Sequence, residues 1–275
     1  MSKKLFYVTT EMTPFASVSP LGDFSVDIPL KLQGMQHDLR TIAPKYGFIS
    51  ERKYILREVI RLRDIPVEFD GDKISTSAKS AFIPKTRVQV YFLEDEVWFK
   101  PLSNLLYKSK NGRILSDNDI RSAFFSNSVL STLPHLFWSP DVILCNGWQS
   151  ALIPALYKQK YEGGEFYKKI KTVQLIHWLD EYPKFSRDAY NKVGIKIPKS
   201  LDKKVINAYS MSAEYADAII LLNQPGNDMS KELLKIDGIK KHKSKIHTID
   251  IDYTESPDYS DVAIKINKVL EKLSD

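Results

Sequence analysis

The segment 140–149, PDVILCNGWQ, constrains the fold of this chain more than any other stretch. Its apolar run VILC has the length and β-branched content of a strand buried on both faces of a parallel sheet. Gly147 ends the run, and apolar residues then recur at a spacing that predicts a helix from about Trp148 to Leu156. Open α/β sheets bind their ligands at such strand ends, so we expect Trp148 and Gln149 at a binding edge. Trp148 can equally be a packing aromatic.

Strands and helices alternate along most of the chain. Short apolar runs predict further strands at 3–10, 38–43, 172–177, 216–222 and 245–250. Apolar residues at helical spacing predict helices at 20–34, 117–133, 201–215, 226–235 and about 260–273. Gly34 is expected to end the first of these helices. The strand–helix–strand order at the start implies a parallel pair joined by a right-handed crossover.

Residues 54–98 differ because apolar and polar residues alternate there. This alternation predicts strands at 54–62, 67–69 and 86–93, with a polar hairpin region over 70–80. Residues 104–113 and 178–200 show little periodicity and are expected to be an exposed loop and an irregular surface segment.

The sequence therefore predicts the α/β class, with one Rossmann-like domain over residues 1–275 and about six mainly parallel strands. A β-rich insert at about 54–98 follows the second strand, and the helix at about 260–273 is expected to seal the domain.

Composition limits the environment and the partners. Cys145 is the only cysteine, which rules out an intrachain disulfide and fits a reducing cytoplasm. No apolar run reaches the roughly 18 residues of a membrane helix, so no membrane partner is expected. The net charge of +6 includes a lysine cluster over 231–245. We interpret this cluster as a solvated face, with an anionic partner less favoured. Aromatic residues do not interleave with it, which argues against a nucleic-acid partner.

The residues with chemical potential form few recognisable motifs. Neither GxGxxG nor GxxxxGK[ST] occurs, and no pair of histidines has metal-ligand spacing, so we expect no cofactor and no metal. His177 ends an apolar strand at the same edge as Trp148, where it could donate to a sugar or phosphate oxygen, act as an acid or base, or simply bond nearby backbone. Asp117 and Arg121 are four residues apart at a helix start, which suits capping and a surface ion pair.

Several motifs taken together resemble the N-terminal domain of bacterial glycogen synthases and plant starch synthases. The segment TTEMTPFASVSPLGDFSVDIPLKLQGMQHDLRTIAPKYG is similar to the family's SSEVAPFAKTGGLADVV…LPKAL…GHDVRVVLPKYG. Four further motifs of the family match. They are D-N-x-x-R, a P-D strand followed by W-[HQ]-x-A-L-x-P, a histidine at a strand end, and an A-D pair. The matching positions include Asp117, Asn118, Arg121, Pro140, Asp141, Trp148, Gln149, Ala151, Leu152, Pro154, His177, Ala216 and Asp217. The resemblance covers residues 3 to about 225, and weakly Ile249, Asp250 and Pro257.

The resemblance implies half of a GT-B glycosyltransferase fold and a role in α-glucan metabolism. The family transfers glucose from ADP- or UDP-glucose to the 4-hydroxyl of an α-1,4-glucan with retention. Matched residue by residue, it implies His177 and Asp117 as catalytic candidates. It implies Glu11, Asp23, Tyr46, Arg121, Trp148 and Gln149 as substrate-binding candidates.

The departures from the family concern the sugar-nucleotide donor. The family's K-T-G-G loop reads Ser17 to Pro20 here, so a lysine and a glycine N–H are missing. Where the family has an Asp before its tryptophan, this chain has Gly147. Where the family has an Asn after the strand-end histidine, this chain has Trp178. The family's second domain, which holds most of the donor site, is expected to be absent, and the terminal helix favours a natural absence.

Three functions fit these observations. The first is glucan synthesis with a partner chain that supplies the missing domain, the chain alone being inactive. The second is a degenerate glucan-binding or regulatory module, in which exposed Trp98, Trp148 or Trp178 stack on sugar rings. The third, a small-ligand Rossmann protein with another nucleotide, is least favoured because no phosphate loop is present. A homodimer would cover an open face rich in Tyr and Trp.

Overall fold

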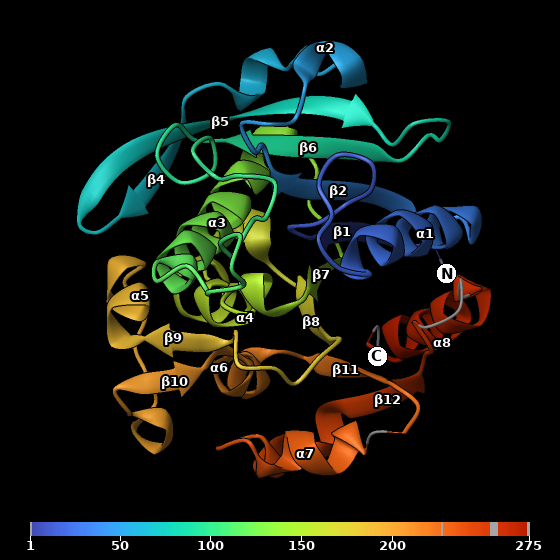
Figure 1. Cartoon of the computed structure of the whole chain (residues 1–275), viewed down its shortest axis with the longest axis vertical. Helices are drawn as coiled ribbons and strands as arrows, with labels where there is room; N and C mark the ends of the chain where they lie inside the picture. Colours follow the sequence, from blue (N-terminus) through green and yellow to red (C-terminus); the bar gives the residue numbers. More distant parts are fainter. Residues whose placement is uncertain (1, 227, 254–257, 274–275) are drawn as a thin grey trace.

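The protein is organised around a large mixed sheet, seen in a computed structural model that describes residues 2–226, 228–253 and 258–273 (Figure 1). The ten strands follow the order β12-β11-β8-β7-β1-β2-β6-β5-β3, with β4 paired to β5. Their bounds are β1 (Lys4–Val8), β2 (Asp38–Pro44), β3 (Arg57–Glu58), β4 (Ile65–Phe69), β5 (Asp72–Phe82), β6 (Gln89–Glu94), β7 (Val142–Asn146), β8 (Lys171–Ile176), β11 (Ala218–Asn223) and β12 (Ile246–Asp250).

All pairings from β12 to β6 are parallel, whereas β5 runs antiparallel to β6, β3 and β4. The strand order reverses between β1 and β7, because β2 and β6 extend to one side and β8, β11 and β12 to the other. Such a reversal opens a crevice at the carboxyl ends of the strands. The predicted α/β class and mainly parallel sheet are confirmed. The expected insert contains β6, which is itself a strand of the parallel sheet.

The central strands are buried on both faces, as their continuous apolar runs predict. Every residue of β7 is buried, and Leu5 to Val8 of β1 are fully enclosed. Helices cover the two faces of the sheet (Figure 1). The helices of the described residues are α1 (Leu21–Gly34), α2 (Glu51–Tyr54), α3 (Asn118–Thr132), α4 (Ile153–Leu156), α5 (Arg187–Lys192), α6 (Ala208–Tyr215), α7 (Met229–Lys235) and α8 (Tyr259–Lys272).

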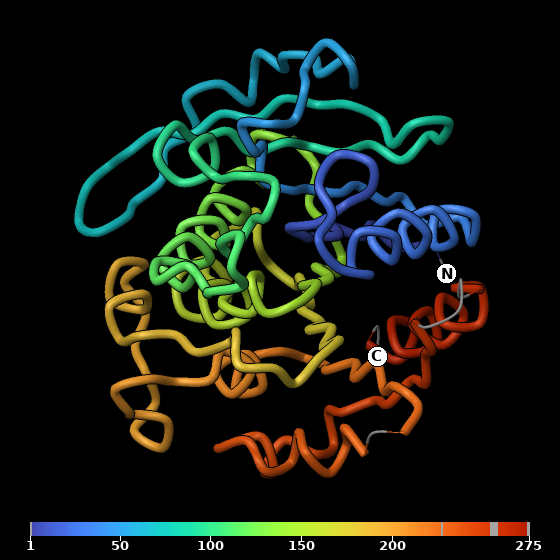
Figure 2. The backbone as a smooth tube through the Cα atoms, in the orientation of Figure 1, coloured from blue at the N-terminus to red at the C-terminus, as the bar shows by residue number. Residues whose placement is uncertain are grey.

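The last helix lies against the first one, far apart in sequence (Figure 2). Lys31 of α1 donates to the hydroxyl of Ser260 over 2.7 Å, and the His37 ring lies 2.8 Å from the Oδ1 atom of Asn267. Helix α8 is thereby fixed against α1 and the residue just before β2. Pro257, a position of weak resemblance to the family just before this helix, lies outside the described residues.

One local prediction in the first half of the chain is wrong, and another is right in kind but not in extent. The strand predicted over 54–62 is not continuous. Its alternating apolar residues do not pack on the core, since the side chains of Ile55 and Ile60 are 67% and 82% exposed. The polar hairpin expected over 70–80 is present, but its turn is confined to Asp70 and Gly71, and strand β5 already begins at Asp72. Helix α1 ends at Gly34, as predicted.

The segment expected to be irregular contains a two-stranded ribbon. Strands β9 (Lys184–Ser186) and β10 (Val205–Asn207) pair antiparallel, and α5 follows β9 directly. The inward residues Phe185 and Ile206 are buried, which explains why this surface segment is ordered. Helix α6 is therefore shorter than predicted and begins at Ala208, after the side chain of Asn207 accepts from the backbone N–H of Tyr209.

Within the described ranges, no helix has both the length and the apolar character needed to cross a membrane.

Candidate functional site

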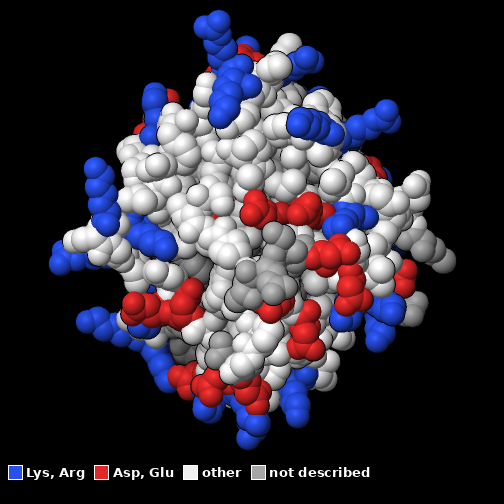
Figure 3. Space-filling view, turned by 45° about the vertical axis from the view of Figure 1, so that its right-hand side comes forward, with Lys and Arg blue, Asp and Glu red and all other residues white. Residues whose placement is uncertain are grey.

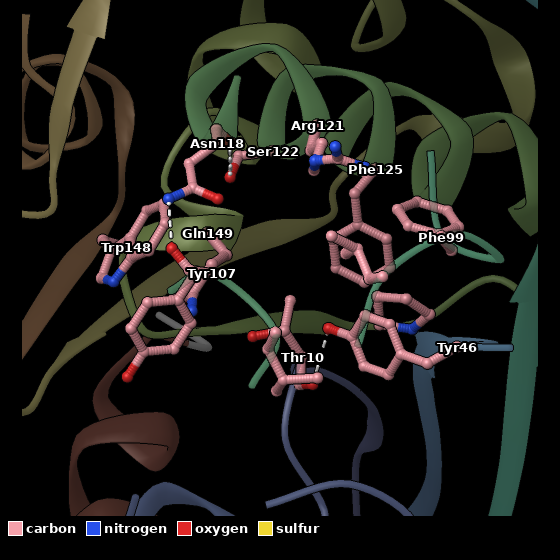
Figure 4. A pocket seen from close by; sticks show the side chains of 13 residues that line it. Thr10, Tyr46, Phe99, Tyr107, Asn118, Arg121, Ser122, Phe125, Trp148 and Gln149 are labelled. Atoms are coloured by element: carbon pink, nitrogen blue, oxygen red, sulfur yellow. Dashed lines mark hydrogen bonds between the residues drawn. The ribbon is translucent and has the colours of Figure 1, made fainter. Parts of the chain in front are cut away.

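A pocket lies at the carboxyl ends of β1, β2 and β7, beside the first turns of α3 (Figure 4). It occupies the crevice where the strand order reverses, and its empty space is about 380 Å³ including the open mouth. We call it the strand-edge pocket. Its lining residues are Thr10, Pro44, Tyr46, Phe99, Leu102, Leu106, Tyr107, Asn118, Arg121, Ser122, Phe125, Trp148 and Gln149.

The turn after β7 places Trp148 and Gln149 in this pocket. Gly147 has φ 79° and ψ 178°, a conformation that only glycine adopts readily. A Cβ atom at this position would lie 3.0 Å from the Oε1 atom of Gln149. The Nε2 atom of Gln174 donates to the carbonyl oxygen of Gly147 over 2.9 Å, which fixes the turn from behind. The predicted long helix is replaced by a 3-10 turn at Trp148–Ser150 and the short α4.

Three buried polar atoms in the pocket have no hydrogen-bond partner. They are the hydroxyl of Thr10, the Nε atom of Arg121 and the Oε1 atom of Gln149. Buried polar atoms are normally paired, and each unpaired atom costs about 1–3 kcal/mol. The three residues that carry these atoms come from three separate segments and line one cavity. A ligand that carries both donors and acceptors would satisfy them.

Aromatic rings form most of the pocket walls (Figure 4). Trp148 and Tyr107 face Tyr46, Phe99 and Phe125 across the open space (Figure 4). Tyr46 is held in place because its hydroxyl donates to the carbonyl oxygen of Thr10 over 3.0 Å. Flat apolar walls with a few fixed polar atoms are the combination that sugar rings require, since one ring face is apolar and the edge carries hydroxyls.

At the mouth, Tyr182 lies near two of these rings. Its centroid is 5.1 Å from that of Tyr107 and 6.2 Å from that of Trp148, to which it is nearly parallel. The ammonium of Lys108 lies 5.2 Å from the Tyr107 ring centroid. Burial raises the pKa of Tyr107, so its hydroxyl remains protonated at neutral pH.

Arg121 links the pocket to the start of α3. One guanidinium nitrogen donates to the carboxylate of Asp117 and another to the carbonyl oxygen of Trp98. The predicted Asp117–Arg121 ion pair is confirmed. The predicted capping role of Asp117 is wrong, because its side chain accepts no backbone N–H of the helix. The Asp117 side chain is 41% exposed and lies outside the pocket lining.

His177 lies behind the pocket and is fully buried. Its Nε2 atom is 2.6 Å from the Oδ1 atom of Asn146, and its Nδ1 atom is 2.7 Å from the hydroxyl of Tyr253. An amide oxygen only accepts, so Nε2 carries the proton and Nδ1 accepts from Tyr253. Burial lowers the pKa of His177 to about 3, which keeps the ring neutral. Its partners are side chains rather than the backbone groups considered from sequence.

Glu11 is also buried, and its carboxylate holds the loop that follows. It accepts from the backbone N–H groups of Val18 at 2.7 Å and Ser19 at 2.9 Å, and from the Ser19 hydroxyl at 3.1 Å. Burial raises the pKa of Glu11 despite these bonds. The carboxylate that the resemblance assigns to substrate is thus occupied by the protein's own backbone.

Asp23 lies on the exposed side of α1 and not in the pocket. Acidic side chains gather on the face that α1 and α8 present in Figure 3. Burial raises the pKa of Asp27; the nearby Lys31 opposes this shift, and the charges of Asp23 and Asp258 add to it.

The structure therefore brings four of the eight predicted site residues into the pocket: Tyr46, Arg121, Trp148 and Gln149. Asp117 adjoins it through Arg121, whereas Glu11, Asp23 and His177 do not line it. Sequence reasoning missed Thr10, Phe99 and Tyr107. The position of Thr10 just after a buried strand was a usable signal, but Tyr107 comes from a loop whose sequence has no periodic pattern.

The tryptophans are not exposed platforms. Trp148 is only 6% exposed and presents part of its ring to the pocket. Trp98 packs against Phe69 and Phe124, and Trp178 against Tyr253. Among the described residues, no group of three or more His, Cys, Asp or Glu side chains is placed to hold a metal ion.

Comparisons with known proteins agree on one family. The model of the starch synthase catalytic domain matches residues 4–235. A glycogen synthase of Pelodictyon phaeoclathratiforme is 34% identical over 222 residues, which are 78% of this chain and 45% of the relative. A glycogen synthase of Chlorobium luteolum is 39% identical over 174 residues, which are 63% of this chain and 35% of the relative. The chain therefore spans less than half the length of these relatives.

A solved structure shows the same fold. The catalytic domain of starch synthase IV from Arabidopsis thaliana, bound to ADP and acarbose, superposes with a TM-score of 0.76 at 19% identity. The match covers 90% of this chain and 51% of that one. The mainly parallel sheet and its helices therefore match in fold the Rossmann-like domain of a GT-B glycosyltransferase.

Proposed function

This chain belongs to the starch synthase catalytic domain family, and we propose that its strand-edge pocket binds glucosyl units of an α-glucan. The observation that carries the proposal is that three residues with unpartnered buried polar atoms line one aromatic-walled pocket. Thr10 and Gln149 offer acceptors, and the Nε–H of Arg121 offers a donor. Sugar hydroxyls both donate and accept, so one glucosyl unit can pair with all three.

The charges of the pocket favour a neutral ligand. Arg121 is the one cationic side chain among the lining residues, and Asp117 already pairs with it. The departure of a nucleoside diphosphate requires positive charge or aimed N–H groups at the phosphates. The Val18 and Ser19 N–H groups of the neighbouring loop are bonded to Glu11. We therefore propose that the 275-residue chain binds glucan without transferring glucose by itself.

Glucosyl transfer from ADP- or UDP-glucose is the second candidate. It is favoured by the resemblance to the family at His177, the residue after β8, and by Arg121 at the pocket. It requires a second set of cationic groups, from a further domain, a partner synthase chain or a second copy of this chain. The acarbose and ADP bound by the Arabidopsis relative are consistent with both candidates.

Calorimetric titration with maltotriose tests glucan binding. Gln149→Leu removes the acceptor at nearly constant volume and is expected to weaken binding at least about ten-fold, as for a site that loses a ligand hydrogen bond. Ser128→Ala is the matched control, because the Ser128 hydroxyl is also buried and unpartnered but does not line the pocket. Equal affinity of Gln149→Leu and the unaltered chain would overturn the proposal.

A second measurement separates binding from catalysis. The purified chain is incubated with glycogen and either ADP-glucose or UDP-glucose, and release of the nucleotide is followed. We expect no release. Release that disappears in His177→Ala, with the fold intact by circular dichroism, would establish transfer by the chain alone.

A further inference from the structure

A second cavity lies where the β9–β10 ribbon meets the start of α6 and the end of α7 (Figure 1). Its empty space is about 1020 Å³ with the open mouth included. We call it the ribbon hollow. Among the described residues, its lining and that of the strand-edge pocket have no member in common. The lining residues are Lys184, Leu201, Lys203, Val205, Ile206, Asn207, Ser210, Lys235, Ile236 and Asp237.

Three lysines from three separate segments line the ribbon hollow. Lys184 lies on β9, Lys203 lies two residues before β10, and Lys235 is the last residue of α7. Asp237 is the one carboxylate among the lining residues. The lining therefore carries an excess of positive charge. Lys235 also belongs to the lysine cluster over 231–245, whose other members do not line the hollow.

The ion pairs of these three lysines are exposed. Lys184 and Lys235 each pair with a glutamate three residues earlier that does not line the hollow. Lys203 pairs with Asp237 from the turn after α7. The side chains in these pairs are 59–70% exposed. Ion pairs this exposed contribute little to stability, so the ammonium groups can turn toward a bound anion.

The first turn of α6 adds a partial positive charge at the hollow. Asn207 caps this eight-residue helix, and its side-chain oxygen accepts from the backbone N–H of Tyr209 over 2.9 Å. Asn207 and Ser210 both line the hollow. The aligned peptide dipoles of a helix favour negative charge near its N-terminus. The helix and the lysines therefore favour the same kind of ligand.

Ser210 gives an independent indication of a ligand. It is 2% exposed, and its hydroxyl has no hydrogen-bond partner. Ser212 on the same helix is also buried, but its hydroxyl donates to the Oε1 atom of Gln174 over 3.1 Å. Buried hydroxyls are normally paired as in Ser212. A ligand oxygen in the hollow would give the Ser210 hydroxyl the partner that the chain does not provide.

Aliphatic side chains complete the lining. Val205 is 50% exposed, Ile236 is half-buried, and Leu201 is buried. The turn after α7 is packed tightly on Leu201, because a Cβ atom at Gly238 would lie 2.6 Å from the Leu201 Cδ2 atom. This contact holds the turn against the segment before β10. The aliphatic surface suits an organic body attached to the anionic group, since contact removes apolar area from water.

From these observations we propose that the ribbon hollow binds a small organic phosphomonoester. The Ser210 hydroxyl and the ammonium groups of Lys203 and Lys235 donate to the phosphate oxygens at the start of α6. The organic part lies against Val205. A phosphomonoester carries nearly two negative charges at neutral pH and three terminal oxygens, so it can accept from several donors at once. This site goes beyond the proposed glucan binding and does not depend on it.

Calorimetric titration of phenyl phosphate, inorganic phosphate and phenol into the full chain tests the proposal. Phenyl phosphate is the probe because it joins the phosphate group to an apolar body. We expect phenol to bind at least about ten-fold more weakly, because it lacks the charged acceptor oxygens. Inorganic phosphate is expected to bind about five-fold more weakly than phenyl phosphate, because it makes no contact with the aliphatic surface.

Four variants locate the binding. Ser210→Ala should weaken phenyl phosphate binding about ten-fold without loss of stability, because it removes a hydroxyl that is unpaired in the free protein. Lys235→Gln should weaken it about five-fold. Lys231→Gln is the matched control, because Lys231 also lies on α7 and pairs with a carboxylate three residues earlier, but does not line the hollow. Ser128→Ala controls for the loss of a buried unpaired hydroxyl. Both controls should leave the affinity unchanged.

Each other outcome would overturn the proposal. Absence of binding by both phosphates would exclude an anion site in the hollow. Equal losses in Lys235→Gln and Lys231→Gln would indicate general attraction to a basic surface. Equal affinities of phenyl phosphate and inorganic phosphate would exclude the organic part. Binding that is lost in Gln149→Leu but kept in Ser210→Ala would assign the probe to the strand-edge pocket. Maltotriose affinity is measured on the same proteins, so failure of this site leaves the proposed function standing.

Discussion

The ring of His177 at the end of β8 lies 2.6 Å from the side-chain oxygen of Asn146 at the end of β7. The same Asn146 donates to the hydroxyl of Ser25 in α1 over 3.0 Å. A chain of buried polar groups therefore joins two neighbouring strand ends and the first helix. On its other side His177 is held by Tyr253, which follows the last strand of the sheet. The strand-end histidine is thus part of the scaffold around the strand-edge pocket.

Acid should destabilise the protein through His177. Its pKa is lowered by burial to about 3 in the folded chain, whereas an unfolded histidine titrates near 6.5. Between these values the unfolded state binds more protons, so stability falls as the pH drops below about 6.5, by up to about 1.4 kcal/mol per pH unit. Urea unfolding at pH 7, 6 and 5 measures this slope, which His177→Gln should reduce. His135→Gln controls for the loss of one histidine, and an unchanged slope in His177→Gln would contradict the prediction.

The buried Glu11 carboxylate should make stability depend on pH in the opposite direction. Its pKa is raised by burial above the ordinary 4.5, so the folded state keeps the proton longer and stability falls as the pH rises through this window. Glu11→Gln removes the titration and keeps an acceptor for the Val18 and Ser19 N–H groups. We expect this variant to lose that pH dependence. Glu11→Ala leaves both N–H groups unpaired and should cost about 1–3 kcal/mol by urea unfolding. Equal losses in both variants would show that the loop requires the charge.

Gly147 should tolerate no side chain. Its φ of 79° with ψ near 180° is strained for other residues by about 1–3 kcal/mol, and a Cβ would press on the Gln149 side-chain oxygen. Gly147→Ala is expected to lower both stability and maltotriose affinity. Gly34→Ala is the matched control and should have the opposite effect on stability, because Gly34 is helical and has open space around it. That control should stabilise by about 0.5–1 kcal/mol. A Gly147→Ala protein as stable as the unaltered chain would contradict the expectation.

Arg121→Lys should damage the pocket although it keeps the charge. One ammonium cannot replace a planar group that lines the pocket and donates to both Asp117 and Trp98. The expected losses are about 1–2 kcal/mol of stability and several-fold in maltotriose affinity, measured by urea unfolding and calorimetry. Arg63→Lys serves as the control, since the Arg63–Glu58 pair is more than half exposed and should change stability by less than about 0.5 kcal/mol. An Arg121→Lys protein that matches this control would refute the argument.

Local sequence patterns were enough to predict the framework of the fold. The buried strands at β1 and β7 follow from their apolar runs, and the pocket-edge positions of Trp148 and Gln149 follow from the strand end before them. The family resemblance, based on motifs in register, is confirmed by the match over residues 4–235. The site residues were harder to predict, because a matched position does not say which way its side chain points.

What the sequence by itself determined is the order of the parallel strands along the chain, the family, and the edge of the sheet at which a ligand would bind. These depend on short-range properties: apolar periodicity, glycine and proline positions, and motif spacing. Only the tertiary structure decided that His177 is enclosed by Tyr253, that Glu11 bonds its own loop, and that Tyr107 forms a pocket wall. Each of these results depends on contacts between segments whose mutual placement is set by packing of the whole core, and no local pattern encodes that placement.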